Sequence, residues 1–196
     1  MCFPSINHGR LAFVGSTTEL DEKEKVSIKL SLCLLDFSDF NFENLLDLGA
    51  SNETFISANS LYIDEQGIYY EISKVKNNIE ETTVKCLNFK NKTEKNLINE
   101  SKNNLCIWQY LDDSMIYNVA YNNATESVVY SYDLKSNEQS KLFEFDGYVY
   151  SIYKDNDKII FLYSLKKGEK ELRGAGVYDI ENSSFNTKDF SEDLFV

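Results

Sequence analysis

A short pattern that recurs four times limits the fold of this chain more than any other feature. An apolar residue, then Asp or Asn, then a second apolar residue has its polar centre at positions 36, 88, 133 and 179, at steps of 52, 45 and 46 residues. Each copy precedes a polar turn and another short segment, as Tyr132-Asp133-Leu134 precedes Ser140–Phe143. Self-similarity at this period is typical of a repeat architecture. The sequence therefore predicts four similar structural units.

The residue types that fill these repeats favour β-strands. The 196 residues include 13 Tyr and 13 Phe, and 42% of the chain is hydrophobic, which excludes intrinsic disorder. Tyr and Phe are enriched on half-buried pleated surfaces. With one Pro and eight Gly, the turns must be built mainly from Asn, Asp, Ser and Lys, whose side chains can close their own turns. The composition therefore predicts an all-β fold.

Each repeat is expected to hold four short antiparallel strands. The first hairpin recurs in every repeat, for example where Ile63 turns into Ile68. The first and second strands, such as Ile159–Tyr163, are apolar on both faces, which predicts that both of their faces are covered. The fourth strand is short and charged, as expected of an exposed rim. The four units are predicted to cover residues 2–49, 50–100, 101–145 and 146–190.

Four strands in a repeat of this length resemble a blade of a β-propeller. The resemblance rests on the apolar-Asx-apolar turn and on the repeated first hairpin, and it covers nearly the whole chain. There is no Trp-Asp repeat, double-glycine signature or Asp-box that would indicate a subfamily. The resemblance implies one repeat domain over residues 1–196, either a closed four-bladed ring, as in haemopexin-like domains, or part of a larger ring. A β-sandwich or barrel is the remaining alternative.

The charge of the chain restricts its partners. The net charge is −12, and only two of the basic residues are arginines, Arg10 and Arg173. Binding to nucleic-acid phosphates needs a basic stripe, so direct binding to DNA or RNA is not expected. The acidic surface favours either solubility alone or association with a partner whose surface is basic.

The sequence also predicts where the protein resides. The four cysteines are widely spread without a C-x-x-C pair, and the single histidine is His8, so no zinc site is expected. The first residues lack the charged and apolar regions of a signal peptide, and no window approaches the ~18 apolar residues of a membrane span. We expect a soluble cytoplasmic protein without membrane association.

No arrangement of residues in the sequence predicts catalysis. His8 is the one imidazole and falls in an expected turn. The carboxylate pairs Asp112/Asp113 and Asp155/Asp157 also fall in turns, where Asp is favoured for backbone reasons. We therefore expect no catalytic residue, no metal, no cofactor and no enzymatic activity.

The loops that join second to third strands are the expected binding surface, because exposed loops on a rigid scaffold concentrate function. The main prediction is a non-enzymatic binding or scaffold module that engages a protein partner through one loop face. The alternatives are a propeller that binds carbohydrate or another small ligand, and a subunit that completes a larger propeller as a homo-oligomer or with another chain. Phe37, Phe40 and Phe42 form a second candidate patch, unless they are tucked beneath the first repeat. The candidate binding residues are Lys76, Asn77, Asn78, Asn122, Asn123, Lys166, Lys167 and Glu169.

Overall fold

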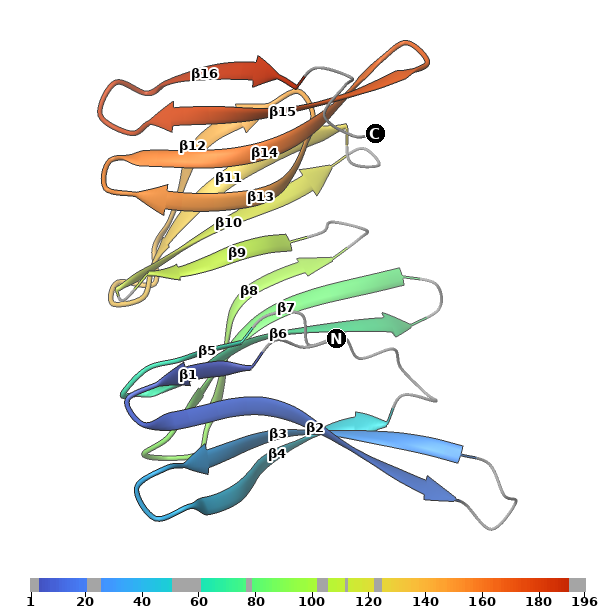
Figure 1. The fold of residues 1–196 in the computed structure, drawn as a ribbon, viewed down its shortest axis with the longest axis vertical. Helices are drawn as coiled ribbons and strands as arrows, with labels where there is room; N and C mark the ends of the chain where they lie inside the picture. The colour runs from blue at the N-terminus through green and yellow to red at the C-terminus, as the bar shows by residue number, and fades with distance from the viewer. Residues whose placement is uncertain are drawn as a thin grey trace. The chain divides into compact units, whose positions relative to one another are not determined.

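The computed structural model describes residues 4–20, 26–50, 61–76, 79–101, 106–111, 113–121 and 125–190. Within these residues the chain forms four separate four-stranded antiparallel sheets, in each of which neighbouring strands follow one another in sequence (Figure 1). This arrangement confirms the prediction of an all-β, propeller-like array of four blades. No helix long and apolar enough to cross a membrane occurs among the described residues.

The sixteen described strands have the following bounds. The first sheet holds β1 (Ser5–Asn7), β2 (Arg10–Leu20), β3 (Val26–Asp36) and β4 (Asn41–Ala50). The second holds β5 (Leu61–Ile63), β6 (Gly67–Lys76), β7 (Ile79–Asn88) and β8 (Glu94–Ser101). The third holds β9 (Cys106–Leu111), β10 (Ser114–Tyr121), β11 (Glu126–Asp133) and β12 (Gln139–Phe145). The fourth holds β13 (Tyr148–Asp155), β14 (Lys158–Lys167), β15 (Lys170–Asp179) and β16 (Ser184–Asp189).

The four sheets fall into two compact units, Met1–Lys102 (unit 1) and Asn103–Val196 (unit 2). Each unit holds two sheets and has its own hydrophobic core. We call the packed contact between the two sheets of a unit a seam. That the whole chain is one domain stays a prediction.

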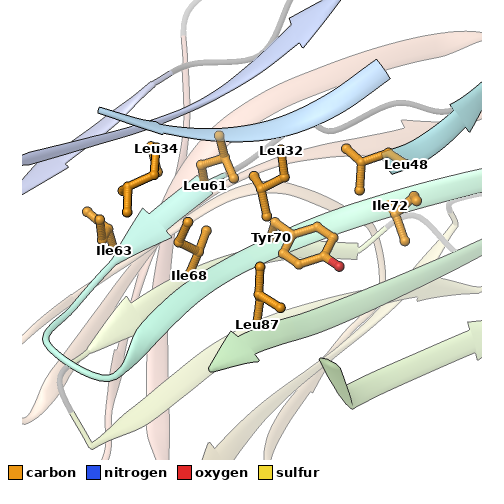
Figure 2. Packing of buried hydrophobic residues seen from close by; sticks show 10 residues of the cluster. Leu32, Leu34, Leu48, Leu61, Ile63, Ile68, Tyr70, Ile72 and Leu87 are labelled. Carbon is orange, nitrogen blue, oxygen red and sulfur yellow. The ribbon is translucent and has the colours of Figure 1, made fainter. Parts of the chain in front are cut away.

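Aliphatic side chains dominate the seam of unit 1. Figure 2 shows Leu32 and Leu34 of β3 lying over Ile68 and Tyr70 of β6. All four side chains are buried. Burial of such side chains contributes ~1.5–3 kcal/mol each to the stability of the folded state, so this seam holds the first two sheets together.

Aromatic side chains dominate the seam of unit 2. Phe143 of β12 lies 5.2 Å from the ring of Phe161 in β14 and 4.6 Å from the ring of Tyr178 in β15, measured between ring centroids. Gly176, opposite Phe161 in the β14–β15 pair, provides the space that the Phe161 ring occupies. The glycine is therefore required by packing and not by its backbone conformation.

The recurring apolar-Asx-apolar pattern forms the turn between the third and fourth strands. In every sheet the Asx side chain accepts a hydrogen bond from a backbone N–H two or three residues later, which is the geometry of an Asx turn. These bonds join Asp36 Oδ1 to Ser38 N at 2.9 Å, Asn88 Oδ1 to Lys90 N at 2.9 Å, Asp133 Oδ1 to Lys135 N at 2.8 Å, and Asp179 Oδ1 to Asn182 N at 3.0 Å.

The apolar residue after each Asx ties this turn to the first hairpin of the same sheet. Its backbone N–H donates a hydrogen bond to a carbonyl oxygen in the turn between the first and second strands. The donors Phe37, Phe89, Leu134 and Ile180 meet the carbonyls of Gly9, Gln66, Asp113 and Asp157, each at 2.9 Å. Four residues after each Asx the backbone adopts a positive φ, at Phe40 (54°), Lys92 (54°), Asn137 (61°) and Ser183 (49°).

One expectation about burial is wrong. The predicted two-sided burial of Ile159–Tyr163 does not hold, because β14 alternates between buried and exposed residues and Ile160 is exposed. β10 in the third sheet is buried along its whole central part, as expected of a strand covered on both faces. The short fourth strand β16 is exposed throughout, as expected of a rim.

The Asx turn of the third sheet should make stability depend on pH. Hydrogen bonds from the backbone N–H groups of Ser136 and Lys135 hold the pKa of the Asp133 carboxyl below its usual value. A lowered pKa in the folded state stabilises the protein above the unfolded pKa, and this contribution is lost as the pH falls through the folded pKa. Asp133→Ala should lower the melting temperature at pH 7, whereas Asp133→Asn, which keeps the acceptor oxygen, should lower it less. The difference between wild type and Asp133→Asn should shrink below about pH 4; an unchanged difference would contradict the assignment.

Gly176→Ala should destabilise the protein, because the added methyl group would overlap the buried ring of Phe161. Overpacking of this kind costs about 1–3 kcal/mol in the free energy of unfolding, measurable by urea denaturation. Gly15→Ala is the matched control, since its methyl group would meet the Cys33 Sγ at 3.1 Å and the backbone oxygen of Ser31 at 4.0 Å, without overlapping a ring. An equal loss in both variants would show that the ring at position 161 does not set the requirement.

Candidate functional site

The predicted binding residues fall into three groups. Lys166, Lys167 and Glu169 lie exposed at the β14–β15 hairpin, whose tip is Gly168 with a φ of +65°. Lys76 ends β6, but its side chain is not among those described. The remaining four, Asn77, Asn78, Asn122 and Asn123, lie outside the described residues. Of the eight, the structure places Lys166 in a groove.

That groove lies in unit 2, at the end of β13, β14 and β15 that is nearest to the β14–β15 hairpin. It consists of two adjoining hollows of about 290 and 230 Å³ that share Tyr148, Ser164 and Glu171. We call it the loop-end groove. Its lining residues are Thr125, Asp146, Gly147, Tyr148, Tyr150, Ser164, Lys166, Glu171 and Arg173.

Strand register brings the polar groups of the groove together. Ser164 of β14 lies opposite Tyr148 of β13 on one side and opposite Arg173 of β15 on the other. In the next row of the same face, Lys166 lies opposite Glu171. Side chains that are directly opposite one another on a sheet lie close enough to interact. A phenol, a hydroxyl, a guanidinium, an ammonium and a carboxylate therefore share one small surface.

A β-bulge places a second tyrosine in the groove. The register between β13 and β14 shifts between Val149 and Ser151, so Tyr150 is the extra residue. The rings of Tyr148 and Tyr150 have centroids 6.2 Å apart and are tilted by 44°. Both rings are partly exposed. They therefore offer an aromatic wall that faces solvent.

Two buried polar side chains of the third sheet hold the bulge in place. Asn118 Nδ2 donates to the carbonyl oxygen of Val149 at 2.8 Å, and Val149 N donates to Ser127 Oγ at 3.0 Å. Both side chains are buried, which makes these bonds strong constraints on the backbone. Sequence analysis missed Asn118 and Ser127. The available signal was a polar Asn inside the otherwise apolar run Met115–Ala120.

The turn before β13 also depends on a small residue. Gly147 N donates to the carbonyl oxygen of Phe145 at 2.9 Å, which closes a tight turn into Tyr148. A Cβ atom at position 147 would lie 2.8 Å from the backbone oxygen of Ser164. Glycine therefore lets the chain pass close to β14 at the edge of the groove.

The ion pair between Arg173 and Glu171 in the groove is weak. Arg173 Nε lies 3.4 Å from Glu171 Oε1, and both side chains are about half exposed, at 52% and 51%. An exposed pair of this kind contributes little to stability, so either group can exchange its partner for a ligand. Burial raises the pKa of the Tyr148 phenol, so this hydroxyl keeps its proton and can donate a hydrogen bond.

In a second groove, in unit 1, the charged side chains already pair with one another. It has a volume of about 250 Å³ and lies at the edge of the seam between the first and second sheets. Arg10 pairs with Asp36 at 3.2 Å and lies over the ring of Phe89 at 5.2 Å. Lys92 pairs with Glu43 at 3.0 Å. The Arg10–Phe89 and Lys92–Glu43 contacts join the two sheets, which makes this groove part of the seam.

The remaining candidates offer little chemistry. His8 lies in the predicted turn, 3.8 Å from Glu65, and Cys33 is a buried free thiol whose pKa is raised by burial. In the part of the chain that the structure describes, no group of three or more His, Cys, Asp or Glu side chains could hold a metal ion. Phe37, Phe40 and Phe42 are exposed, so the alternative that they are tucked beneath the first repeat is wrong.

Comparison with known proteins gives a fold but no family. No family model matches the chain, and no curated protein matches it. Similar solved structures include an oligogalacturonate lyase from Vibrio parahaemolyticus, with a TM-score of 0.67 and 9% identity, covering 95% of this chain and 53% of that one. Another is an oligogalacturonate lyase in complex with manganese, with a TM-score of 0.63 and 10% identity, covering 93% of this chain and 51% of that one. The β-propeller domain of the Trilobed protease from Pyrococcus furiosus matches with a TM-score of 0.59 and 12% identity, covering 97% of this chain and 56% of that one.

These matches overturn the prediction that the chain is not an enzyme. That prediction rested on the lack of a catalytic arrangement of residues in the sequence, yet the lyases, and an acylaminoacyl peptidase from Pyrococcus horikoshii, are enzymes that contain a similar fold. The fold therefore does not exclude catalysis.

The length of the matched region is informative. The chain spans about half the length of the lyases and of the Trilobed protease domain. At 9–12% identity the likeness establishes the fold alone. The chain is a β-propeller-like array of four blades, a shorter array than the proteins it resembles.

Proposed function

We propose that this chain binds a small ligand that carries hydroxyl groups and a carboxylate, such as a unit of an acidic sugar, in the loop-end groove of unit 2. The observation that carries the proposal is the placement of two tyrosine rings, 6.2 Å apart, beside Arg173 and Lys166. Small-ligand sites combine an aromatic or apolar wall with a few polar groups that fix orientation.

Each part of the groove matches one part of such a ligand. The rings of Tyr148 and Tyr150 can pack against the apolar face of a sugar ring, as amphipathic aromatic side chains do. The guanidinium of Arg173 can bind a carboxylate through two parallel hydrogen bonds. Glu171 and Asp146 can accept hydrogen bonds from ligand hydroxyls.

The charge balance of the groove supports an acidic ligand in spite of the acidic chain. Two cations, Lys166 and Arg173, line the groove together with two carboxylates, Asp146 and Glu171. The groove is therefore locally near neutral, while the chain as a whole carries −12. A ligand carboxylate can compete with Glu171 for Arg173, because the exposed contact between these two side chains is weak.

The comparisons add support from the names of the matched proteins. Two of them are oligogalacturonate lyases, which by name act on a chain of acidic sugars. The protein partner expected at the polar loops, through Lys76, Lys167, Glu169 and the four asparagines, stays a prediction. Lys166 belongs to both proposals.

Calorimetric titration with galacturonate oligomers tests the proposal. We expect measurable binding, and much weaker binding of the matching neutral galactose oligomers, which have a hydroxymethyl group where the acid has a carboxylate. Arg173→Ala should weaken binding about 10-fold or more, because a hydrogen bond to a charged group is worth ~1.5–3 kcal/mol. Tyr150→Ala should weaken it as well, whereas Tyr150→Phe should retain most of it.

The control is Lys158→Ala, at an exposed site at the other end of β14 from Lys166. It should leave binding unchanged. The proposal fails if the acidic oligomers do not bind, if the neutral oligomers bind equally well, or if Lys158→Ala and Arg173→Ala have equal effects.

A further inference from the structure

The two faces of each sheet can be distinguished by the second strand. One residue of this strand lies on what we call the forward face, and its two chain neighbours lie on the reverse face, because side chains alternate along a strand. The forward residues, at equivalent places after the first hairpin, are Ala12, Tyr69, Ile116 and Ile160. The reverse residues are Leu11 and Phe13, Ile68 and Tyr70, Met115 and Tyr117, and Ile159 and Phe161.

Both seams in the structure join a forward face to a reverse face. In unit 1, Ala12 of the first sheet belongs to the same core cluster as Ile68 and Tyr70 of the second. In unit 2, Ile116 of the third sheet clusters with Ile159 and Phe161 of the fourth. Within each unit the sheets therefore pack by one rule, with the forward face of the earlier sheet on the reverse face of the later one.

The forward face of the fourth sheet breaks this rule. Ile160 is 40% exposed, whereas the equivalent residues Ala12, Tyr69 and Ile116 are 0%, 6% and 2% exposed. The residues opposite Ile160 in the neighbouring strands are Tyr153 and Val177, and both are exposed as well. Three apolar side chains thus form an exposed row across this sheet.

The reverse face of the first sheet carries a matching apolar row. Ile6, Leu11, Leu35 and Phe42 lie opposite one another across all four strands. The outer two are strongly exposed, Ile6 at 68% and Phe42 at 58%. Phe13, on the same face, extends the row, with its ring 6.1 Å from that of Phe42. At the equivalent reverse position of the other sheets, Ile68, Met115 and Ile159 are fully buried.

We infer that the forward face of the fourth sheet in one copy of this chain packs on the reverse face of the first sheet in a second copy. One chain thus carries both halves of a seam of the kind that it already forms twice. If two copies form a closed pair, each forward face meets the reverse face of the other copy, and all the exposed faces are covered. The matched structures are about twice as long as this chain, so two copies together have a comparable length.

The apolar row and the loop-end groove occupy opposite ends of one face of the fourth sheet. Ile160 lies near the start of β14, and the groove residue Ser164 lies four residues further along the same face. The inference does not depend on ligand binding.

Sedimentation velocity of the whole chain over a range of concentrations tests the inference. We expect the wild type to associate beyond a monomer, and more tightly at higher salt, because salt screens the repulsion between two chains of charge −12. Ile160→Glu and Phe42→Glu should each weaken association about 100-fold or more, because each would bury an unpaired carboxylate. Ile28→Glu is the matched control, since Ile28 is equally exposed, at 41%, and lies on neither face of the proposed contact. Circular dichroism should show that all three variants keep their strands.

Mixing the two variants tests which faces meet. Each of them alone places a glutamate in every contact. In an equimolar mixture, one contact of a closed pair joins two unaltered faces, so association should partly return. The inference is overturned if the wild type remains a monomer at every concentration, if Ile28→Glu dissociates the chain as strongly as Ile160→Glu, or if the mixture shows no recovery. Loss in Ile160→Glu with no loss in Phe42→Glu would indicate contact between two forward faces and would also overturn it.

Discussion

The hydrogen bond from the residue that directly follows each Asx to the first hairpin joins the two halves of every sheet. It has the same length, 2.9 Å, in all four sheets, although the residues that form it differ. The Asx side chain fixes the turn, and the next N–H then reaches the neighbouring turn. Both hairpins of a sheet are thereby held together at one end. The seams and the groove depend on this alignment, because strand register decides which side chains share a face.

The same dependence on backbone geometry appears at the groove. Val149 lies at a bulge, where ladder hydrogen bonds are interrupted, and two buried side chains from the third sheet supply replacements. Asn118 and Ser127 act on the groove only through this backbone. The tyrosines on either side of Val149 owe their spacing to groups that never reach the groove. The bonds of Asn118 Nδ2 and Ser127 Oγ favour one backbone conformation, because a buried polar group that loses its partner is costly.

Much of the fold could be predicted from the sequence because the signals for it were local. The Asx pattern, the first hairpins and the charged β16 each depend on a few consecutive residues, and each appears in the structure where it was expected. The site was less accessible, because it depends on register between strands. Lys166 was recognised as a loop residue, but its neighbours Tyr148 and Arg173 come from other strands and could be placed only after pairing was known. The bulge at Tyr150 has no clear sequence signal.

The error at β14 has a physical cause that bears on assembly. An apolar run such as Ile159–Tyr163 indicates that both faces of a strand are designed to be covered, but it does not say by which chain. The structure covers one face and leaves Ile160 exposed. At the same time the outer strand β16 is short and, apart from Phe185, polar, and it contains Lys188 and Asp189, features that discourage pairing along a sheet edge. The fourth sheet therefore disfavours pairing along its β16 edge and favours packing on the apolar face that carries Ile160. Association through that face does not build an open-ended β-ladder.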